Sequence, residues 1–314
     1  MSEAAVRKIV ITGAAGLVGQ NLIARLRERL DLTLVGIDKH PSNVDTLARL
    51  HPEVEVIAAD IAEPGAWTAA FEGADAVVLL HAQIGGLDPA AFEANNVTAT
   101  RRVLDAVKAA GVSYLVHVSS SVVNSQAVDF YTESKKAQER VVTESGIPHA
   151  TLRPTLMFGW FDRKHIGWLA RFMRRTPVFP IPGSGRFMRQ PLYARDFSDI
   201  VAACLDRRLE GAWNISGLER IDYIDLIKAV KHATGAGTPL LRIPYGLFWG
   251  LLWVYALFDG DPPFTTAQLE ALVTPDSFEV IDWPAIFGVP ATPLDEALRA
   301  TFNDTAYSGV VLDF

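Results

Sequence analysis

The sequence has one cysteine, no excess of positive charge and no leader pattern at its start. Because Cys204 is the only cysteine among 314 residues, an internal disulfide framework and a cysteine-rich metal site are excluded, and we expect no bound metal. The net charge of −7 argues against nucleic acid as a partner, since duplex-binding domains usually carry a basic face. The first residues do not show the charged and apolar regions of a secretory signal, so we expect a cytoplasmic protein.

Hydrophobic residues make up 49% of the chain and charged residues 21%, which is ordinary for a globular protein and excludes wholesale disorder. The length is more than one simple core needs and less than two large domains need. We therefore expect one main domain with a smaller appended region.

The first half alternates short apolar runs with longer stretches of helical periodicity. The apolar runs predict strands at 8–12, 32–38, 54–58, 76–80, 114–119 and 150–152. The stretches between them predict helices at 17–30, 43–50, 65–72, 89–110 and 131–145. Continuous apolar strands that alternate with helices indicate an α/β fold with a doubly wound, Rossmann-like parallel sheet. We expect this domain to span 1–155, with 190–215 returning to it, and an interleaved substrate-binding region to occupy most of 156–314.

Three stretches of the second half stand out. Residues 176–185 are dense in proline and glycine and predict mostly loop, and Asp196 is the expected N-cap of a helix that ends at Asp206. Residues 243–258 carry no charge but are shorter than the roughly 20 residues of a membrane span. A buried or interface helix is the favoured interpretation. A lid over an apolar substrate and a shallow membrane contact are alternatives, of which the membrane contact is the weaker.

A glycine-rich turn joins the first strand to the first helix. Gly13 allows a tight turn, Gly16 lets a pyrophosphate approach the backbone, and Gly19 lets the helix pack close to the sheet. Leu17 and Val18 open the helix, whose N-terminus offers free N–H groups to phosphates. Because a predicted strand precedes this GxxGxxG motif and a predicted helix follows it, the motif predicts a dinucleotide-binding site.

Two acidic positions extend this site. Asp38 ends the second strand, where its carboxylate can bind the ribose hydroxyls and repel a 2′-phosphate, which favours NAD over NADP. Lys39 and His40 follow directly and could soften that repulsion. Asp60 and Ile61 follow the third strand, and we expect them near the adenine.

A tyrosine and a lysine four residues apart, Tyr131 and Lys135, open the helix after the fifth strand. Side chains at this spacing share one helix face, and an ammonium beside a phenol lowers the tyrosine pKa towards neutrality. The preceding strand ends in three serines, 119–121, of which one hydroxyl could orient a substrate oxygen. Ser120 is the preferred candidate and Ser121 the next.

With these motifs the chain resembles the short-chain dehydrogenases/reductases, and within them the extended NAD-dependent epimerase/dehydratase family. The resemblance covers nearly the whole chain. It is carried by Thr12-Gly-Ala-Ala-Gly-Leu-Val-Gly19, Asp38, Asp60-Ile61, Val77-Val-Leu-Leu-His-Ala-Gln83, Asn96-Val-Thr-Ala-Thr100, Val118-Ser-Ser-Ser121, Tyr131 with Lys135, Leu152-Arg-Pro154, and Arg189 with Asp196.

The resemblance implies roles for these residues. Tyr131 would be the general acid and base, Lys135 would bind the nicotinamide ribose, and Ser120 would orient the substrate. Cofactor contacts would also come from Leu80, His81, Ala82, Asn96 and Pro154. Substrate contacts would come from Ser121 and from Arg189, which looks like the arginine that sugar-nucleotide enzymes place on a diphosphate. A homodimer through 89–110 and 131–145 is likewise implied.

The reaction expected from the resemblance is hydride transfer at a secondary alcohol of a small molecule, with a nucleotide sugar as the favoured substrate of an epimerase or dehydrogenase. Sugar 4,6-dehydratases carry an Asp-Glu pair where this chain has Ser121-Val122, so dehydratase chemistry is not expected. Two alternatives stay open. One is a hydroxysteroid-dehydrogenase-like enzyme for an apolar alcohol, and the other is a non-catalytic NAD(P) sensor.

Overall fold

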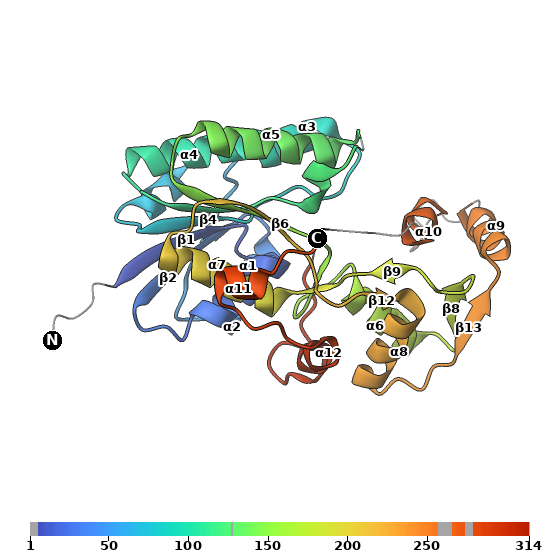
Figure 1. The fold of residues 1–314 in the computed structure, drawn as a ribbon. Coiled ribbons are helices and arrows are strands. Elements are labelled where there is room, and N and C mark those ends of the chain that lie inside the picture. Colours follow the sequence, from blue (N-terminus) through green and yellow to red (C-terminus); the bar gives the residue numbers. More distant parts are fainter. Residues whose placement is uncertain (1–5, 127, 257–265, 274–278, 314) are drawn as a thin grey trace.

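A parallel sheet of seven strands organises the protein, and the α/β, Rossmann-like prediction is confirmed. The computed structural model describes residues 6–126, 128–256, 266–273 and 279–313 (Figure 1). The strand order is β11-β6-β5-β4-β1-β2-β3. The strands are β1 (Arg7–Thr12), β2 (Leu32–Asp38), β3 (Glu55–Ala58), β4 (Ala76–Leu79), β5 (Leu115–Val118), β6 (His149–Pro154) and β11 (Gly211–Ile215).

Helices cover both faces of the sheet, as Figure 1 shows. One layer holds α1 (Leu17–Leu26), α2 (Pro41–Leu50) and α7 (Ala194–Arg207). The other holds the short 3₁₀ helix η1 (Ala66–Phe71), α4 (Ala99–Ala109) and α5 (Phe130–Glu144). Because both faces are covered, Ile9, Val10 and Ile11 in β1 are all fully buried. Burial of each such side chain stabilises the fold by about 1.5–3 kcal/mol.

The sheet reverses its direction of winding at β1, which pairs with β2 on one side and with β4 on the other. Thr12 is in register with Ile37 and with Leu79, so the residues that follow these three strands lie along one edge. Crossovers that leave to opposite faces open a crevice at this point, and ligands of such sheets bind there.

The helix expected at 89–110 is built from three pieces. These are α3 (Pro89–Phe92), a π-helical segment η2 (Glu93–Thr98) and α4. Asn96 lies in the π-helical segment, where its side chain is buried and accepts a hydrogen bond from the backbone N–H of Gln83 at 2.6 Å. The extra residue in this turn therefore directs a polar side chain to the loop that follows β4.

Smaller elements form the second region beyond β6. The strand pairs are β7 (Met157–Phe158) with β10 (Leu192–Tyr193), β9 (Met188–Arg189) with β12 (Ile221–Asp222), and β8 (Phe179–Pro182) with β13 (Leu240–Ile243). The helices are α6 (Ile166–Arg175), α8 (Tyr223–Thr234), α9 (Tyr245–Ala256), α10 (Thr266–Val273), α11 (Trp283–Phe287) and α12 (Leu294–Asn303). A separate small core of α6, α8 and α12 residues stabilises this region.

The structure corrects two predictions here. Residues 179–182, expected to be loop, form β8, because a two-stranded ladder tolerates the missing N–H groups of its prolines. Asp196 is not an N-cap. The helix α7 begins directly after β10, with Tyr193 as its cap, and the Asp196 carboxylate instead accepts hydrogen bonds from Thr292 N at 2.9 Å and Thr292 Oγ1 at 2.6 Å.

The uncharged stretch predicted at 243–258 forms the helix α9, while its last two residues lie outside the described part of the chain. The side chains of Leu247 and Trp253 are 58% and 52% exposed, so α9 is not buried in this chain's own core. In the part of the chain that the structure describes, no helix combines the length and the apolar character needed to cross a membrane.

Candidate active site

A cavity of about 750 Å³ lies along the carboxyl edge of the sheet and reaches the residues that follow β1, β2, β4, β5 and β6. We call it the main cavity. The predicted site residues that line it are Gly13, Gly16, Leu17, Val18, Gly19, Asp38, Asp60, Ile61, Leu80, His81, Ala82, Ser120, Ser121, Tyr131, Lys135 and Pro154. Residues far apart in the sequence therefore meet in one space of the size that small-molecule sites have.

The three glycines of the first turn have different reasons to lack a side chain. Gly13 has a φ of +70°, and a Cβ there would lie 2.7 Å from the backbone N of His81. A Cβ at Gly19 would lie 2.4 Å from the Ala14 carbonyl oxygen. At Gly16 a Cβ would meet only one atom, at 3.4 Å, so this position borders open space. Gly16 is also the N-cap of α1 and has no side chain over the helix N–H groups, which fits a dinucleotide diphosphate.

The Asp38 carboxylate lies beside this turn and is nearly buried. It accepts hydrogen bonds from the backbone N–H of Ala15 at 3.0 Å, and from the backbone N at 3.1 Å and ring Nδ1 at 3.0 Å of His40. Burial alone would raise the pKa of Asp38, but the bonds from His40 and Ala15 outweigh it and lower the pKa. The carboxylate therefore stays ionised, where it can accept ribose hydroxyls and repel a 2′-phosphate.

Lys39 reaches across the same end of the cavity. Its ammonium donates to Asp60 Oδ2 at 3.2 Å and to Asn95 Oδ1 at 2.6 Å. The ion pair with Asp60 partly neutralises Lys39, so Lys39 would stabilise the 2′-phosphate of NADP less than an unpaired lysine would. Asn95, a residue that the sequence did not single out, comes from the π-helical segment.

The three serines at the end of β5 have different surroundings. The Ser119 hydroxyl donates to Glu139 Oε2 at 2.8 Å, on the α5 side of the sheet. The Ser120 hydroxyl oxygen accepts a hydrogen bond from the backbone N–H of Val122 at 3.4 Å and interacts with the Tyr131 phenol, whose pKa it lowers. Ser121 has no side-chain hydrogen bond to any described residue and lines the main cavity. The three hydroxyls that the sequence left open therefore point to three different places.

Tyr131 lies in the first turn of α5, which Asp129 caps by accepting a hydrogen bond from Thr132 N at 2.9 Å. Burial raises the pKa of Tyr131, while the hydrogen bond with Ser120 lowers it, and the net shift is upward. The expected depression by Lys135 is absent from this structure, because burial has the largest effect on the Tyr131 pKa and outweighs the interaction with Ser120.

Lys135 is fully buried, and its amine is held by two acceptors. Nζ donates to the Val118 carbonyl oxygen at 3.1 Å and to Gln138 Oε1 at 2.5 Å. Burial lowers the pKa of Lys135 to about 7, so near neutral pH the amine alternates between its charged and neutral forms. A third hydrogen remains on the ammonium for a hydroxyl in the cavity.

A buried hydrogen-bond network extends from Lys135 to the glycine turn. Gln138 Nε2 donates to Thr100 Oγ1 at 2.9 Å, and the Thr100 hydroxyl donates to a backbone carbonyl at 2.7 Å. The remaining lone pair of Thr100 faces His81 Nε2 at 2.9 Å, so His81 must donate there. His81 Nδ1 then accepts from Thr12 Oγ1 at 2.7 Å. Burial lowers the pKa of His81 to about 3, which keeps this ring neutral.

The buried lysine predicts a specific dependence of stability on pH. Between pH 7 and the ordinary lysine value of 10.5, the unfolded chain binds more protons at Lys135 than the folded chain. The free energy of unfolding therefore rises with pH across this window. Compared with Lys135→Met, the wild type should gain about 1–3 kcal/mol between about pH 7 and about pH 9.5 in urea unfolding. An equal pH slope in the two proteins would contradict the burial of a titrating amine.

Two predicted site residues do not line the main cavity. Asn96 is buried behind it, where its Nδ2 donates to the Gln83 carbonyl at 3.1 Å and to Ser134 Oγ at 2.8 Å. Arg189 lies on β9, and its guanidinium donates to the backbone carbonyls of Met188 and Leu272. In this structure Arg189 therefore contacts the smaller elements beyond β6 and does not line the main cavity.

The segment that follows β7 adds two kinds of residue to the main cavity. Arg163 and Lys164 line it and begin the basic stretch 163–175, a sequence signal that favours an anionic substrate such as a nucleotide sugar. Leu156, Met157 and Phe161 add an apolar wall. Sequence reasoning missed this wall, since its side chains look like ordinary core residues. Among the described residues, no group of His, Cys, Asp and Glu could hold a metal ion.

Comparison with known proteins decides the family. Residues 9–216 match the model of the NAD dependent epimerase/dehydratase family. The protein belongs to this family. The match covers most of the chain. The predicted membership of this family and the predicted cofactor, NAD, are therefore confirmed.

Two characterised relatives differ in the substrate that they are named for. The chain is 30% identical over 300 residues to the dTDP-L-rhamnose 4-epimerase of Burkholderia thailandensis, covering 74% of this chain and 83% of that one. It is 27% identical over 270 residues to the 3 beta-hydroxysteroid dehydrogenase/Delta 5-->4-isomerase of Mycobacterium tuberculosis, covering 75% and 72%. Sequence similarity therefore connects this chain both to a nucleotide-sugar epimerase and to a hydroxysteroid dehydrogenase.

Solved structures show the same fold at lower identity. The UDP-glucuronic acid 4-epimerase of Bacillus cereus, in complex with NAD, superposes with a TM-score of 0.73 at 22% identity and covers 94% of this chain and 96% of its own. The UDP-glucose 4-epimerase of Thermotoga maritima gives a TM-score of 0.74 at 18% identity, with 94% and 97% covered.

Proposed function

We propose that the protein is an NAD-dependent epimerase or dehydrogenase that acts on a secondary alcohol of a nucleotide sugar. The observation that carries the proposal is one cavity that is lined by Ser120, Tyr131 and Lys135 and also by the glycine turn and Asp38. A proton-transfer group and a dinucleotide cradle in one space are what hydride transfer at an alcohol requires.

NAD would lie along the sheet edge and supply the nicotinamide that accepts and returns a hydride. Gly16 and the N-terminus of α1 would bind its diphosphate, and Asp38 its adenosine ribose. Lys135 would donate to the second ribose with the N–H that Gln138 and Val118 leave unused. These three contacts come from fixed backbone or buried side chains, so the binding site is largely formed before the cofactor arrives.

Tyr131 would take the proton from the substrate hydroxyl as the carbon is oxidised and return it on reduction. Ser120, beside the phenol, would hold the substrate oxygen within reach. A phenol with a raised pKa stays protonated near neutral pH and cannot take up a proton, so the charge of Lys135 would have to act on Tyr131 once the cofactor is bound. Ser121 and Val122 offer no acid–base pair, which is why water elimination is not part of the proposal.

The substrate class rests on the relatives and on the cations in the cavity. The name of the rhamnose epimerase relative gives a dTDP sugar as its substrate, and Arg163 and Lys164 would face the diphosphate of such a molecule. Arg189 is a proposed further contact to that diphosphate, although it would have to release two backbone carbonyls to reach it.

The proposal is tested with purified protein, NAD and a panel of UDP- and dTDP-sugars. The expected result is conversion of at least one of them to its 4-epimer or to an oxidised sugar, followed by chromatography of the sugars and by absorbance of reduced NAD. A panel that yields neither product, with NAD binding intact, contradicts the proposal and favours a cofactor sensor.

A hydroxysteroid-dehydrogenase-like activity is the second candidate. It is favoured by the mycobacterial relative and by the apolar wall of Leu156, Met157 and Phe161. The same panel, extended by a 3β-hydroxysterol, separates the two candidates, because sterol oxidation without any sugar conversion would establish the second.

A further inference from the structure

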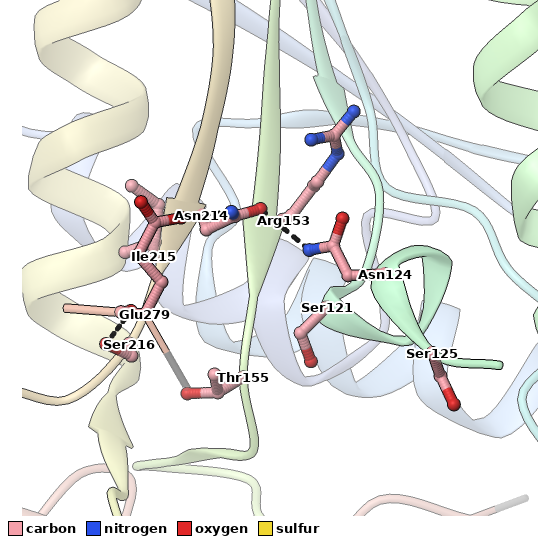
Figure 2. A pocket seen from close by; sticks show the side chains of 9 residues that line it. All are labelled: Ser121, Asn124, Ser125, Arg153, Thr155, Asn214, Ile215, Ser216 and Glu279. Atoms are coloured by element: carbon pink, nitrogen blue, oxygen red, sulfur yellow. Dashed lines mark hydrogen bonds between the residues drawn. The ribbon is translucent and has the colours of Figure 1, made fainter. Parts of the chain in front are cut away.

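A second hollow, which we call the side pocket, lies at the carboxyl ends of β6 and β11 and has a volume of about 380 Å³ (Figure 2). It shares Ser121 and Thr155 with the main cavity. Ser121 is the neighbour of Ser120, which lines the main cavity together with Tyr131. A substrate held by Ser120 and Tyr131 would therefore be next to the side pocket.

A row of polar side chains crosses the side pocket. Asn214 Nδ2 donates to Glu279 Oε2 at 2.7 Å, and Asn124 Nδ2 donates to Asn214 Oδ1 at 3.0 Å (Figure 2). The carboxylate can only accept, so it fixes the orientation of both amides. The row leaves two acceptors without a hydrogen bond to a described residue, the carbonyl oxygen of Asn124 and the second oxygen of Glu279, and the Ser121 hydroxyl lines the same pocket.

The charge of the side pocket is negative. Arg153 and Glu279 are the ionisable side chains among the described residues that line it. The Arg153 guanidinium turns away from the other labelled side chains in Figure 2, and its Nε donates to Glu139 at 3.1 and 3.2 Å. Arg153 is thus neutralised by Glu139, while Glu279 has no ion-pair partner among the described residues. A phosphate or carboxylate in this space would be repelled.

We propose that the side pocket binds the hydroxyl groups of a neutral sugar ring and discriminates against rings that carry a carboxylate. Sugar hydroxyls are donors, and they match the free acceptors of Asn124 and Glu279, while Ser121 can accept or donate. Glu279 excludes the anionic diphosphate from this pocket, and the cations Arg163 and Lys164 attract it in the main cavity. The inference rests on the proposed function and adds to it a preference between sugars.

The preference is measured with two probes that differ at one group of the ring, UDP-glucose and UDP-glucuronic acid. Each is titrated calorimetrically into the NAD-loaded protein, and kcat and KM are measured for whichever is converted. The wild type should bind UDP-glucose at least about tenfold more tightly. Glu279→Gln keeps the shape of the side chain and removes its charge, so it should reduce this ratio at least about fivefold, mainly through tighter binding of UDP-glucuronic acid.

A second variant tests the hydrogen bonds rather than the charge. Asn214→Ala removes the centre of the row and should raise KM for UDP-glucose about three- to tenfold with little change in kcat. The affinity for NAD should stay the same in both variants, since neither residue lines the main cavity. Glu210→Gln is the matched control. It removes an exposed carboxylate at the opposite end of β11 and should leave the ratio unchanged.

The outcomes separate this inference from the function that it rests on. A wild type that binds and converts both sugars equally, or a Glu279→Gln ratio equal to that of the wild type, overturns the side-pocket proposal and leaves the epimerase or dehydrogenase function intact. A protein that binds neither sugar, but oxidises a sterol, overturns both.

Discussion

Tyr131→Phe will lower kcat by about 10²–10⁴-fold while leaving the affinity for NAD within about twofold of the wild type. The phenol oxygen is the group that exchanges the proton with the substrate, and phenylalanine removes it without changing the ring. Tyr131 is half-buried in the first turn of α5 and interacts with Ser120, and the variant leaves the Ser120 hydroxyl in place to bind the substrate oxygen. KM should therefore change much less than kcat.

The measurement is steady-state turnover of the preferred substrate together with calorimetric NAD binding. Tyr245→Phe is the control, because it removes a phenol from the partly exposed helix α9, far from the cavity lining. Equal turnover by Tyr131→Phe and the wild type would show that another group moves the proton.

Gly19→Ala will weaken NAD binding at least about tenfold and lower the free energy of unfolding by about 1–3 kcal/mol. A Cβ at this position would lie 2.4 Å from the Ala14 carbonyl oxygen and 2.6 Å from that of Gly13. Both are backbone atoms and cannot rotate away, so the turn itself has to shift. This shift moves the backbone of residues 13–16, which would bind the diphosphate of NAD. The same displacement therefore lowers both the stability of the fold and the affinity for NAD.

The matched control is Gly250→Ala, which makes the same change at a helical glycine in α9. No atom lies within 4 Å of a Cβ built at Gly250. Alanine is preferred to glycine in a helix, so this variant should be neutral or slightly more stable. Urea unfolding and NAD titration compare the two variants directly, and equal behaviour would show that the turn adapts to a methyl group.

The strands of the sheet were predictable because most of them are continuous apolar runs that are buried on both faces. The edge strand β11 was not, since Trp213 and Asn214 interrupt its apolar character. Its pairing with β6 joins segments about 60 residues apart, which local periodicity does not encode. The strand β8 was missed for a related reason. Its prolines predict loop, and only its partner β13 makes it a strand.

The site was predictable where its residues are close in the sequence. The glycine turn and the Tyr131–Lys135 spacing are local patterns with a direct physical meaning. The groups that bind the Lys135 amine were not predictable in this way. Gln138 shares its helix, but its partner Thr100 comes from α4 and His81 follows β4, so the network exists only after three elements pack together. The predicted decrease of the Tyr131 pKa was wrong. The pKa is raised by burial, which also depends on how the elements pack together.

The path of the chain has a consequence for any attempt to exchange substrate regions between relatives. The chain leaves the sheet after β6, builds β7, α6, β8, β9 and β10, and then returns as α7 and β11 before it leaves again (Figure 1). Helix α7 packs against α1 through residues such as Phe197 and Ile200, which belong to the main core. A transplant with a single junction after Pro154 would therefore carry away α7 and β11, which belong to the main core and the main sheet. A functional chimera needs at least three crossover points.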